Sequence, residues 1–433
     1  MTTYKYRMPG GLLQLTITGE QNKFLTGNPK MTYFKYGYCQ HTNFAMESIS
    51  QVFDGTIDFG QKVSTTITRN GDLVSGMMLE ITLPELPSLV ENSQTFRVNW
   101  VNAIGYYLIE YISLEIGGTE IDRHTGEWLY LQHQLELPLT KKKLRDELVH
   151  HQEFTVIEDS SKLKCYVPLQ FWFSKEIGNA IPLVSLQYHD VKVHVKFRDF
   201  EKCVIVEKIV NYTSSSTNCI EPESIEATRL PPPVSIQDAK LYCDYIFLDK
   251  QERKWFAQTT HRYLIEQLQY NGVEHIVSSE HKLQLVFNHP CKELIWYSTL
   301  ANSTQKNDWL NFSKTPNTLN NYGSSPKNDI LQTATLFLNG HERLSPRDAA
   351  YFRLVNAEQF HSGVPDNYVY SYPFSLFPEK MQPSGVLNFS MIDNAFMTFT
   401  NSPDILEHDV HMFAKNYNIL IITQGMAGLA FSN

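Results

Sequence analysis

The chain of 433 residues contains no Cys-x-x-Cys pair, so it lacks the usual motif of zinc ribbons and of thioredoxin-like redox sites. Its cysteines are scattered instead, at Cys39, Cys165, Cys203, Cys219, Cys243 and Cys291. So few cysteines in so long a chain do not make a disulfide framework. We therefore expect mostly buried, free thiols in a reducing compartment.

Long apolar runs are also absent. No stretch reaches the roughly 18 consecutive apolar residues from which a membrane-spanning helix is recognised. The N-terminal segment MTTYKYRMPGGLLQLTITGEQ is interrupted by Gln14, Thr16 and Thr18, so it has no apolar region of the kind that signal peptides contain. We expect neither a membrane span nor a secretory leader.

An excess of positive charge is missing as well: 37 Lys and Arg stand against 46 Asp and Glu, for a net charge of −9. Proteins that bind the nucleic-acid backbone usually carry a basic surface. The best candidate for base stacking is MTYFKYGYCQHTNF, residues 31–44, which has five aromatic residues with Lys35 and His41 between them. Its cation density is low for a nucleic-acid platform, and an ordinary buried β-strand shows the same aromatic pattern. We therefore interpret it as a strand region with alternate rings in the core and the others against a neighbouring segment or subunit. We expect no direct contact with nucleic acid.

What the sequence does contain is apolar alternation with a period of two. Residues 191–197 in HDVKVHVKFRD alternate between apolar and polar side chains, and residues 75–84, SGMMLEITLP, do the same, as half-buried strands require. The Asn-Gly steps at 70–71, 271–272 and 339–340 suit type I′ hairpins. Many short strands separated by such turn residues predict an all-β sandwich or barrel. The few helical patterns lie at 126–135, 141–149, 250–258 and 345–354.

The chain also divides into two halves. Residues 213–233, TSSSTNCIEPESIEATRLPPP, are polar and end in three prolines, which is typical of a linker between domains. The flanking halves resemble each other weakly: LEIGGTE at 114–120 matches LFLNGHE at 336–342, and VPLQFWFS at 167–174 corresponds in order to YPFSLFP at 372–378. Because the order of these matches is preserved, they predict a duplicated sandwich domain.

Catalytic and metal-binding motifs are hard to find. The sequence has no GxSxG elbow, no GxxxxGKS/T phosphate loop and no GxGxxG motif. His189 and His194 occupy an odd and an even position, so in a strand they point to opposite faces and cannot share a metal ion. His408 and His411 have no third ligand in a suitable pattern. We expect no cofactor, no metal ion and no catalytic residue.

Several long blocks follow one another in a recognisable order. They are TNFAMESI, FGQKVSTTITRNGDL, IDRHTGEWL, IPLVSLQYHDVKV, LDKQERKWFAQTTHRYLIEQ, LFLNGHERLSPRDAAYFRLV, QPSGVLNFSMIDNA and NYNILIITQGMAGLAFSN. Together they resemble the major capsid protein family of nucleocytoplasmic large DNA viruses. The resemblance implies an all-β fold of two tandem antiparallel eight-stranded jelly rolls. We expect an N-terminal arm at 1–26, a first jelly roll at 27–212, the linker at 213–233 and a second jelly roll at 234–433.

The resemblance further implies a structural role rather than an enzymatic one. Three chains are expected to form a homotrimeric, pseudo-hexameric capsomer that tiles the icosahedral shell of a large double-stranded DNA virus. Expected partners are neighbouring capsomers, minor capsid and penton proteins, and the internal viral membrane, which is approached from the N-terminal side. The expected location is the virion, after assembly in the host cytoplasm. The family usually begins near Met8, so either Met1 or Met8 is the start.

Two alternatives to this function stay open. One is a less abundant capsid paralogue in the same particle. The other is a carbohydrate-binding or hydrolytic protein with the same jelly-roll architecture, since a fold alone does not determine a function.

The segment 301–328, ANSTQKNDWLNFSKTPNTLNNYGSSPKN, is rich in Asn, Ser and Thr and shows no sustained alternation. A run of this length without regular structure is normally a surface loop. By analogy with the family we expect it on the outside of the virion. Asn302 in NST and Asn311 in NFS match the acceptor pattern for N-glycosylation and are the candidate modification sites.

Overall fold

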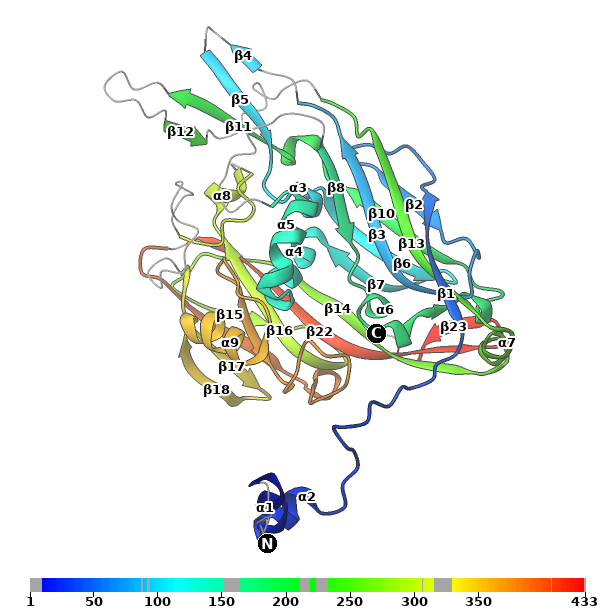
Figure 1. Ribbon diagram of the computed structural model, residues 1–433. Helices are drawn as coiled ribbons and strands as arrows, with labels where there is room; N and C mark the ends of the chain where they lie inside the picture. The colour runs from blue at the N-terminus through cyan, green and yellow to red at the C-terminus, as the bar shows by residue number, and fades with distance from the viewer. Residues whose placement is uncertain are drawn as a thin grey trace, which may run out of the picture. The chain divides into compact units, whose positions relative to one another are not determined.

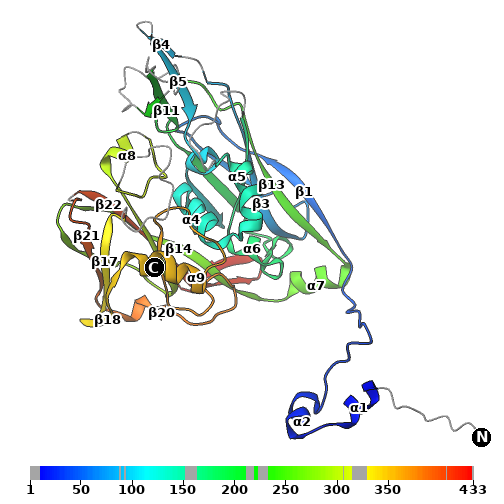
Figure 2. The ribbon, with the colours of Figure 1, turned by 60° about the vertical axis from the view of Figure 1, so that its left-hand side comes forward.

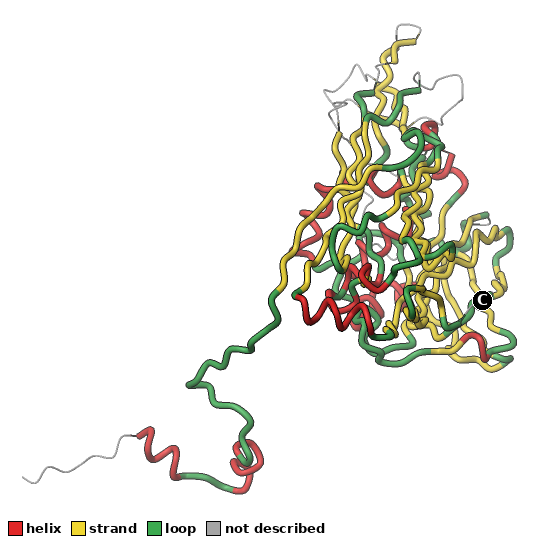
Figure 3. Tube along the Cα trace, turned by 90° about the vertical axis from the view of Figure 1, so that its right-hand side faces the viewer, coloured by secondary structure: helices red, strands yellow, loops and turns green. Residues whose placement is uncertain are grey.

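The computed structural model describes residues 10–86, 89–91, 94–151, 163–210, 219–222, 233–305, 307–314, 329–405 and 407–431. The chain divides into two units, Met1–Asn43 and Phe44–Asn433. All the described sheets belong to the second unit (Figures 1 and 3).

The first half of the large unit folds as a jelly roll of two antiparallel sheets. Their strand orders are β1-β13-β3-β8, with β9 beside β3, and β2-β10-β6-β7. The bounds are β1 Phe44–Val52, β2 Lys62–Thr66, β3 Leu73–Leu83, β6 Ile109–Ile116, β7 Thr119–Thr125, β8 Leu163–Pro168, β9 Ile181–Pro182, β10 Val191–Phe197 and β13 Asp238–Leu248.

The second half repeats this arrangement. Its sheets have the orders β14-β22-β16-β19 and β15-β21-β17-β18, with β20 beside β16 and β23 beside β22. The bounds are β14 His261–Ile276, β15 Glu280–Gln284, β16 Pro290–Thr299, β17 Leu331–Leu338, β18 His341–Asp348, β19 Tyr370–Pro373, β20 Leu387–Asn388, β21 Ala395–Asn401, β22 His408–Thr423 and β23 Met426–Leu429.

Each half has eight main strands: β1, β2, β3, β6, β7, β8, β10 and β13 in the first half, and β14 to β19, β21 and β22 in the second. Numbering them one to eight in chain order shows the repeat. Both halves then have sheets of order 1-8-3-6 and 2-7-4-5, which is the strand arrangement of a jelly roll. The predicted all-β double jelly roll is therefore confirmed. One continuous hydrophobic core runs through both rolls.

Helices and a small sheet occupy the insertions between these strands (Figures 1 and 2). The small sheet has the order β12-β11-β5-β4, from β4 Leu89–Glu91, β5 Gln94–Trp100, β11 Val204–Val210 and β12 Cys219–Pro222. The α-helices of this unit are α3 Ile104–Tyr107, α4 Gly126–Glu136, α5 Leu139–Val149, α6 Trp172–Lys175, α7 Lys250–Gln258, α8 Ala301–Gln305 and α9 Asn356–Phe360. The other helical turns are η1 Ile177–Asn179, η2 Leu183–Ser185, η3 Phe200–Lys202, the π-helix η6 Tyr351–Val355, and η7 Phe389–Met391.

Local sequence explains several of these elements. The alternation at 191–197 gives β10, whose four apolar side chains are buried while the three polar ones between them are half-buried. Thr125 caps α4 by accepting from the Trp128 amide, and Asp249 caps α7 by accepting from two amides. The helices predicted at 126–135, 141–149 and 250–258 are confirmed. The pattern at 345–354 is instead divided between the end of β18 and η6.

The domain boundaries differ from those expected. Strand β13 pairs with β1 and β3, so it is the eighth strand of the first roll. The second roll therefore starts after β13 and not at 234. The proline-rich segment 213–233 lies, in chain order, between the seventh and eighth strands of the first roll. Its polar, proline-rich composition therefore belongs to an insertion within the first roll and not to a domain boundary.

The first roll also starts later than residue 27, because its first strand begins at Phe44. The interpretation of 31–44 as a core strand was wrong for nearly its whole length: the described residues of the first unit are all exposed, and Phe34 is 98% exposed. The described residues of this unit contain helices α1 Gly10–Thr16 and α2 Glu20–Thr26 and no strand. Within the described residues no helix is long and apolar enough to cross a membrane.

Candidate functional site

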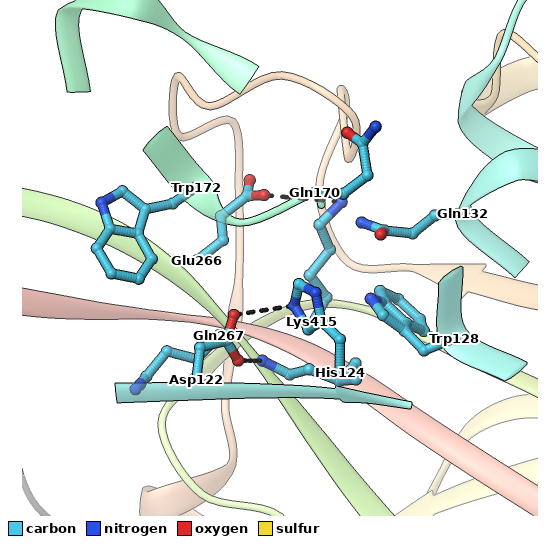
Figure 4. A pocket seen from close by; sticks show the side chains of 10 residues that line it. Asp122, His124, Trp128, Gln132, Gln170, Trp172, Glu266, Gln267 and Lys415 are labelled. Carbon is cyan, nitrogen blue, oxygen red and sulfur yellow. Dashed lines mark hydrogen bonds and ion pairs between the residues drawn. The ribbon is translucent and has the colours of Figure 1, made fainter. Parts of the chain in front are cut away.

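The two rolls meet where β7 of the first roll lies against β14 of the second (Figure 4). The Asp122 carboxylate accepts a hydrogen bond from the backbone amide of Leu268 at 3.0 Å. Next to it, the Gln267 side-chain amide donates to the Ile121 carbonyl. Strand β14 ends its sheet, and an end strand has backbone groups that need partners. The Asp122 carboxylate supplies one such partner, to the Leu268 amide.

The Asp122 carboxylate is itself held in place. Its other oxygen lies 2.9 Å from Nε2 of His124, and both side chains are almost completely buried. The His124 ring stacks on Phe171, with 4.7 Å between ring centroids. The carboxylate that contacts β14 is therefore fixed by the core of the first roll.

A cluster of buried charges crosses the same junction. Lys415 in β22 lies 2.7 Å from Glu136 at the end of α4, 3.4 Å from Glu293 in β16 and 3.8 Å from Glu266 in β14. Lys175 in α6 bridges back to Glu136 at 2.9 Å and to Glu266 at 3.3 Å. The cluster thus joins two helices of the first roll to the main sheet of the second.

The electrostatics favour the charged forms of Glu136 and Lys415. Burial disfavours the charged form of Glu136, but Lys175 and Lys415 together hold its pKa well below the usual range. Burial likewise opposes the charge on Lys415, yet its carboxylate neighbours raise its pKa well above the usual range. Burial and the Lys415 charge lower the pKa of Lys292, which pairs with Glu266, to about 8. Buried ion pairs of this kind fix geometry, since breaking one leaves an unpaired charge in the interior.

Two spaces of very different size remain at the junction. The cavity lined by residues shown in Figure 4 measures about 10 Å³, which is room for about one water molecule. Beside it, β7, β14 and the C-terminal segment line a wider hollow of about 300 Å³. Within the described residues no group of three or more His, Cys, Asp or Glu side chains could hold a metal ion. The junction is built to hold the rolls together.

The segment that begins at residue 301 is also part of this junction, which corrects the expectation of an irregular surface loop over 301–328. Residues 301–305 form α8, and the Trp309 ring stacks on Tyr107 of the first roll at 4.5 Å. The Trp309 indole N–H donates to the Asn102 carbonyl at 2.8 Å, and the Asn307 side chain donates to Val204 at 2.9 Å. The sequence predicted a loop because the segment is polar, but its three apolar residues near 310 anchor it. Residues 315–328 lie outside the described part of the chain.

The two candidate glycosylation sites lie in this segment. Asn302 is in α8. Asn311 is only 4% exposed; its side-chain amide donates to Asp308 at 3.1 Å and its oxygen accepts from the Ser313 hydroxyl at 2.8 Å. Attaching a glycan to Asn311 requires this turn to open. Glycosylation of either residue stays a prediction.

The histidine pairs weighed in the sequence do not come together as metal ligands. His189 accepts from the Ala427 amide, whereas His194 pairs with Glu115 in β6. His408 and His411 lie in β22, and the His411 ring stacks on Tyr297 at 4.7 Å. His189 and His194 therefore make hydrogen bonds or ion pairs, and His411 packs against a tyrosine.

The junction residues themselves were missed by the sequence reasoning. Asp122 and Leu268 are 146 positions apart, and Glu136 and Lys415 are 279 apart, so no local motif connects them. One signal was available: Lys415 is the one Lys, Arg, Asp or Glu in the long strand sequence VHMFAKNYNILII, residues 410–422. A lone charge in a buried strand indicates a buried partner.

Comparison with known proteins gives matches to two successive parts of the chain. Residues 32–249 match the family described as "Major capsid protein N-terminus", and residues 252–428 match "Large eukaryotic DNA virus major capsid protein". The division between the two matches falls directly after β13, in agreement with the strand pairing.

Similar proteins cover almost the whole chain. The major capsid protein of Phaeocystis pouchetii virus is 34% identical, over 98% of this chain and 100% of the relative. That of Paramecium bursaria Chlorella virus 1 is 35% identical over the same shares. A chain from the quasi-atomic model of the PBCV-1 virus capsid is 31% identical, with a TM-score of 0.75 over 93% of this chain and 100% of that one. The Faustovirus major capsid protein, 14% identical with a TM-score of 0.71 over 94% of each chain, shares the fold.

Proposed function

The chain belongs to the major capsid protein family of large eukaryotic DNA viruses, and from this premise we propose that three copies form a homotrimeric, pseudo-hexameric capsomer that tiles an icosahedral shell. The coarse function, a structural component of a viral capsid, comes with the family. The observation that carries the proposal is the repeat: each chain contains two jelly rolls of identical strand order, joined through one core. Three such chains present six similar rolls.

The rigid junction supports this role. A tile in a shell must keep its two rolls in a fixed relation, because each roll contacts different neighbours. The buried charge cluster defined by Glu136, Lys175, Glu266, Glu293 and Lys415 provides such a constraint. We expect neighbouring capsomers to contact the outer edges of this tile.

The first unit supplies a second kind of contact. Its described residues are all exposed and include large apolar side chains: Leu12, Leu13, Leu15, Ile17, Phe24, Leu25, Met31, Tyr33, Phe34, Tyr36 and Tyr38. Exposed apolar side chains in such number mark an interaction site. In our proposal this arm binds minor capsid or penton proteins and approaches the internal viral membrane, in particles assembled in the host cytoplasm.

The trimer is tested by the mass of the purified protein in solution. Light scattering coupled to size exclusion should give about three times the chain mass of 50.0 kDa. A monomer that persists at high protein concentration would contradict the proposal. The same preparation addresses the hydrolytic or carbohydrate-binding alternative, because saturable glycan binding or turnover by a monomer would favour it.

A less abundant capsid paralogue would have the same fold and the same mass in solution. Its copy number in purified virions separates the two roles. If the chain is the main shell protein, quantitative mass spectrometry should find it in far greater amount than any other capsid chain.

A further inference from the structure

The contact between the two rolls uses one particular pair of strands. It joins β7, the fifth strand of the first roll, to β14, the first strand of the second roll. Each of these strands stands at the end of its sheet. The same two positions exist a second time in the chain: β18 is the fifth strand of the second roll, and β1 is the first strand of the first roll.

The side chains of the pair in contact, β7 and β14, are less exposed than those of the equivalent pair, β18 and β1. In β7 the side chains of Ile121, Asp122 and His124 are buried, and Glu266 in β14 is buried as well. In β18, by contrast, every residue except the half-buried Leu344 is exposed. In β1, Met46 is 47% exposed and Val52 is 74% exposed. The chain therefore covers its β7–β14 pair and leaves the equivalent surfaces of β18 and β1 open.

We propose that β18 of one copy packs against β1 of the next copy, in the way that β7 packs against β14 within the chain. This inference rests on the homotrimer proposed above and names the surfaces that form it. The occupant of each open surface is a second copy of the chain, because the chain already contains one example of the same strand positions in contact.

The placement of the two surfaces fits a ring. Strands β18 and β1 lie at opposite ends of the large unit in both views (Figures 1 and 2). Two different surfaces on one molecule make a head-to-tail contact, which closes into a ring when the rotation allows it. In a trimer the internal and external contacts then alternate around six rolls.

The chemistry of the two strands is compatible with this contact. Strand β1 offers apolar Met46 and Val52 on one face, and one exposed carboxylate, Glu47, on the other. Strand β18 carries exposed Arg343 and Arg347, which can pair with that carboxylate. An open, partly apolar end strand is also a surface that proteins normally cover.

Cysteine cross-linking tests the inference on the full chain. Cys39 and Cys219 are first replaced by serine, since Cys39 is exposed, and the described remaining thiols are buried. Ser48→Cys in β1 and Ser345→Cys in β18 are then introduced together, both at exposed positions. A short bis-maleimide should produce a covalent species of about three times the 50.0 kDa chain mass on a denaturing gel. An equimolar mixture of the two single variants should produce a cross-linked dimer.

A matched control replaces the β18 cysteine with Glu280→Cys. Glu280 is exposed in β15, at the opposite edge of the same sheet, so its pairing with Ser48→Cys should give no cross-link. Repeating the main experiment with residues 44–433 tests whether the arm covers β1 instead. The link should persist, and its appearance only within single chains would overturn the inference.

Light scattering on the same samples separates the two proposals. A trimer that gives no link between Ser48→Cys and Ser345→Cys overturns the β18–β1 contact and leaves the capsomer proposal intact. A monomer overturns both. As a second readout, Met46→Asp should weaken trimer formation by about tenfold, since the contact would then bury an unpaired carboxylate in place of the remaining exposed apolar surface of the methionine. Met391→Asp, at a residue 77% exposed outside both strands, should leave it unchanged.

Discussion

Replacing Lys415 with methionine should strongly destabilise the large unit. The Lys415 side chain is 3% exposed and has three carboxylates within 4 Å, those of Glu136, Glu293 and Glu266. Methionine keeps most of the volume and removes the charge. Lys175 still neutralises Glu136 and Glu266 in part, whereas Glu293 keeps the His361 imidazole at 3.6 Å and, among the described residues, no second lysine. Breaking a buried ion pair from one side costs about 3–5 kcal/mol, and we expect a loss of unfolding free energy in that range.

The matched control uses the same substitution at an exposed pair. Lys202 lies 3.9 Å from Asp199, and their side chains are 59% and 66% exposed, so Lys202→Met should cost less than about 1 kcal/mol. Urea unfolding of both variants is compared with the unaltered chain at one protein concentration, because oligomer stability depends on concentration. Hydrogen exchange should show faster opening at β7 and β14 in Lys415→Met. Equal losses in the two variants would refute the reasoning that the cluster holds the junction.

Three further predictions follow from the same contacts. Because the pKa of Glu136 is lowered from its ordinary 4.5, its stabilising contribution is full above that value and is lost as the pH falls below it; acid should therefore destabilise the unaltered chain more than Lys415→Met, and parallel pH titrations of the urea midpoint check this. Trp309→Ala should cost about 3–5 kcal/mol, as buried tryptophans do, whereas Trp255→Ala, at a residue 56% exposed, should cost much less in the same assay. Deletion of residues 1–43 should leave a folded trimer by light scattering that no longer forms shells, and an insoluble product would instead make the arm part of the folded core.

Much of the fold was predictable because short sequence patterns specify individual strands and turns. The alternation at 191–197 identified β10 and its buried face. The echo between LEIGGTE and LFLNGHE marks equivalent hairpins: Gly117-Gly118 joins β6 to β7 and Asn339-Gly340 joins β17 to β18, all four residues with positive φ. Such two-residue turns need left-handed backbone, which Gly and Asn tolerate.

Other features depended on tertiary context that no local pattern contains. Asn271-Gly272 looks like a hairpin turn but lies within β14, at a shift of its register with β22. Strand β13 follows a proline-rich segment, yet its partners β1 and β3 lie far earlier in the chain. The rings at 31–38 had the spacing of a core strand, yet their side chains are exposed. The junction cluster draws each charge from a different element, so only the folded chain brings it together.

Electron cryo-microscopy of the purified chain tests the central claim most directly, because it images the six rolls of a capsomer. The account predicts particles with threefold symmetry and a six-lobed outline, in which junctions within chains alternate with junctions between chains. Particles with only two lobes, or open head-to-tail filaments, would contradict it.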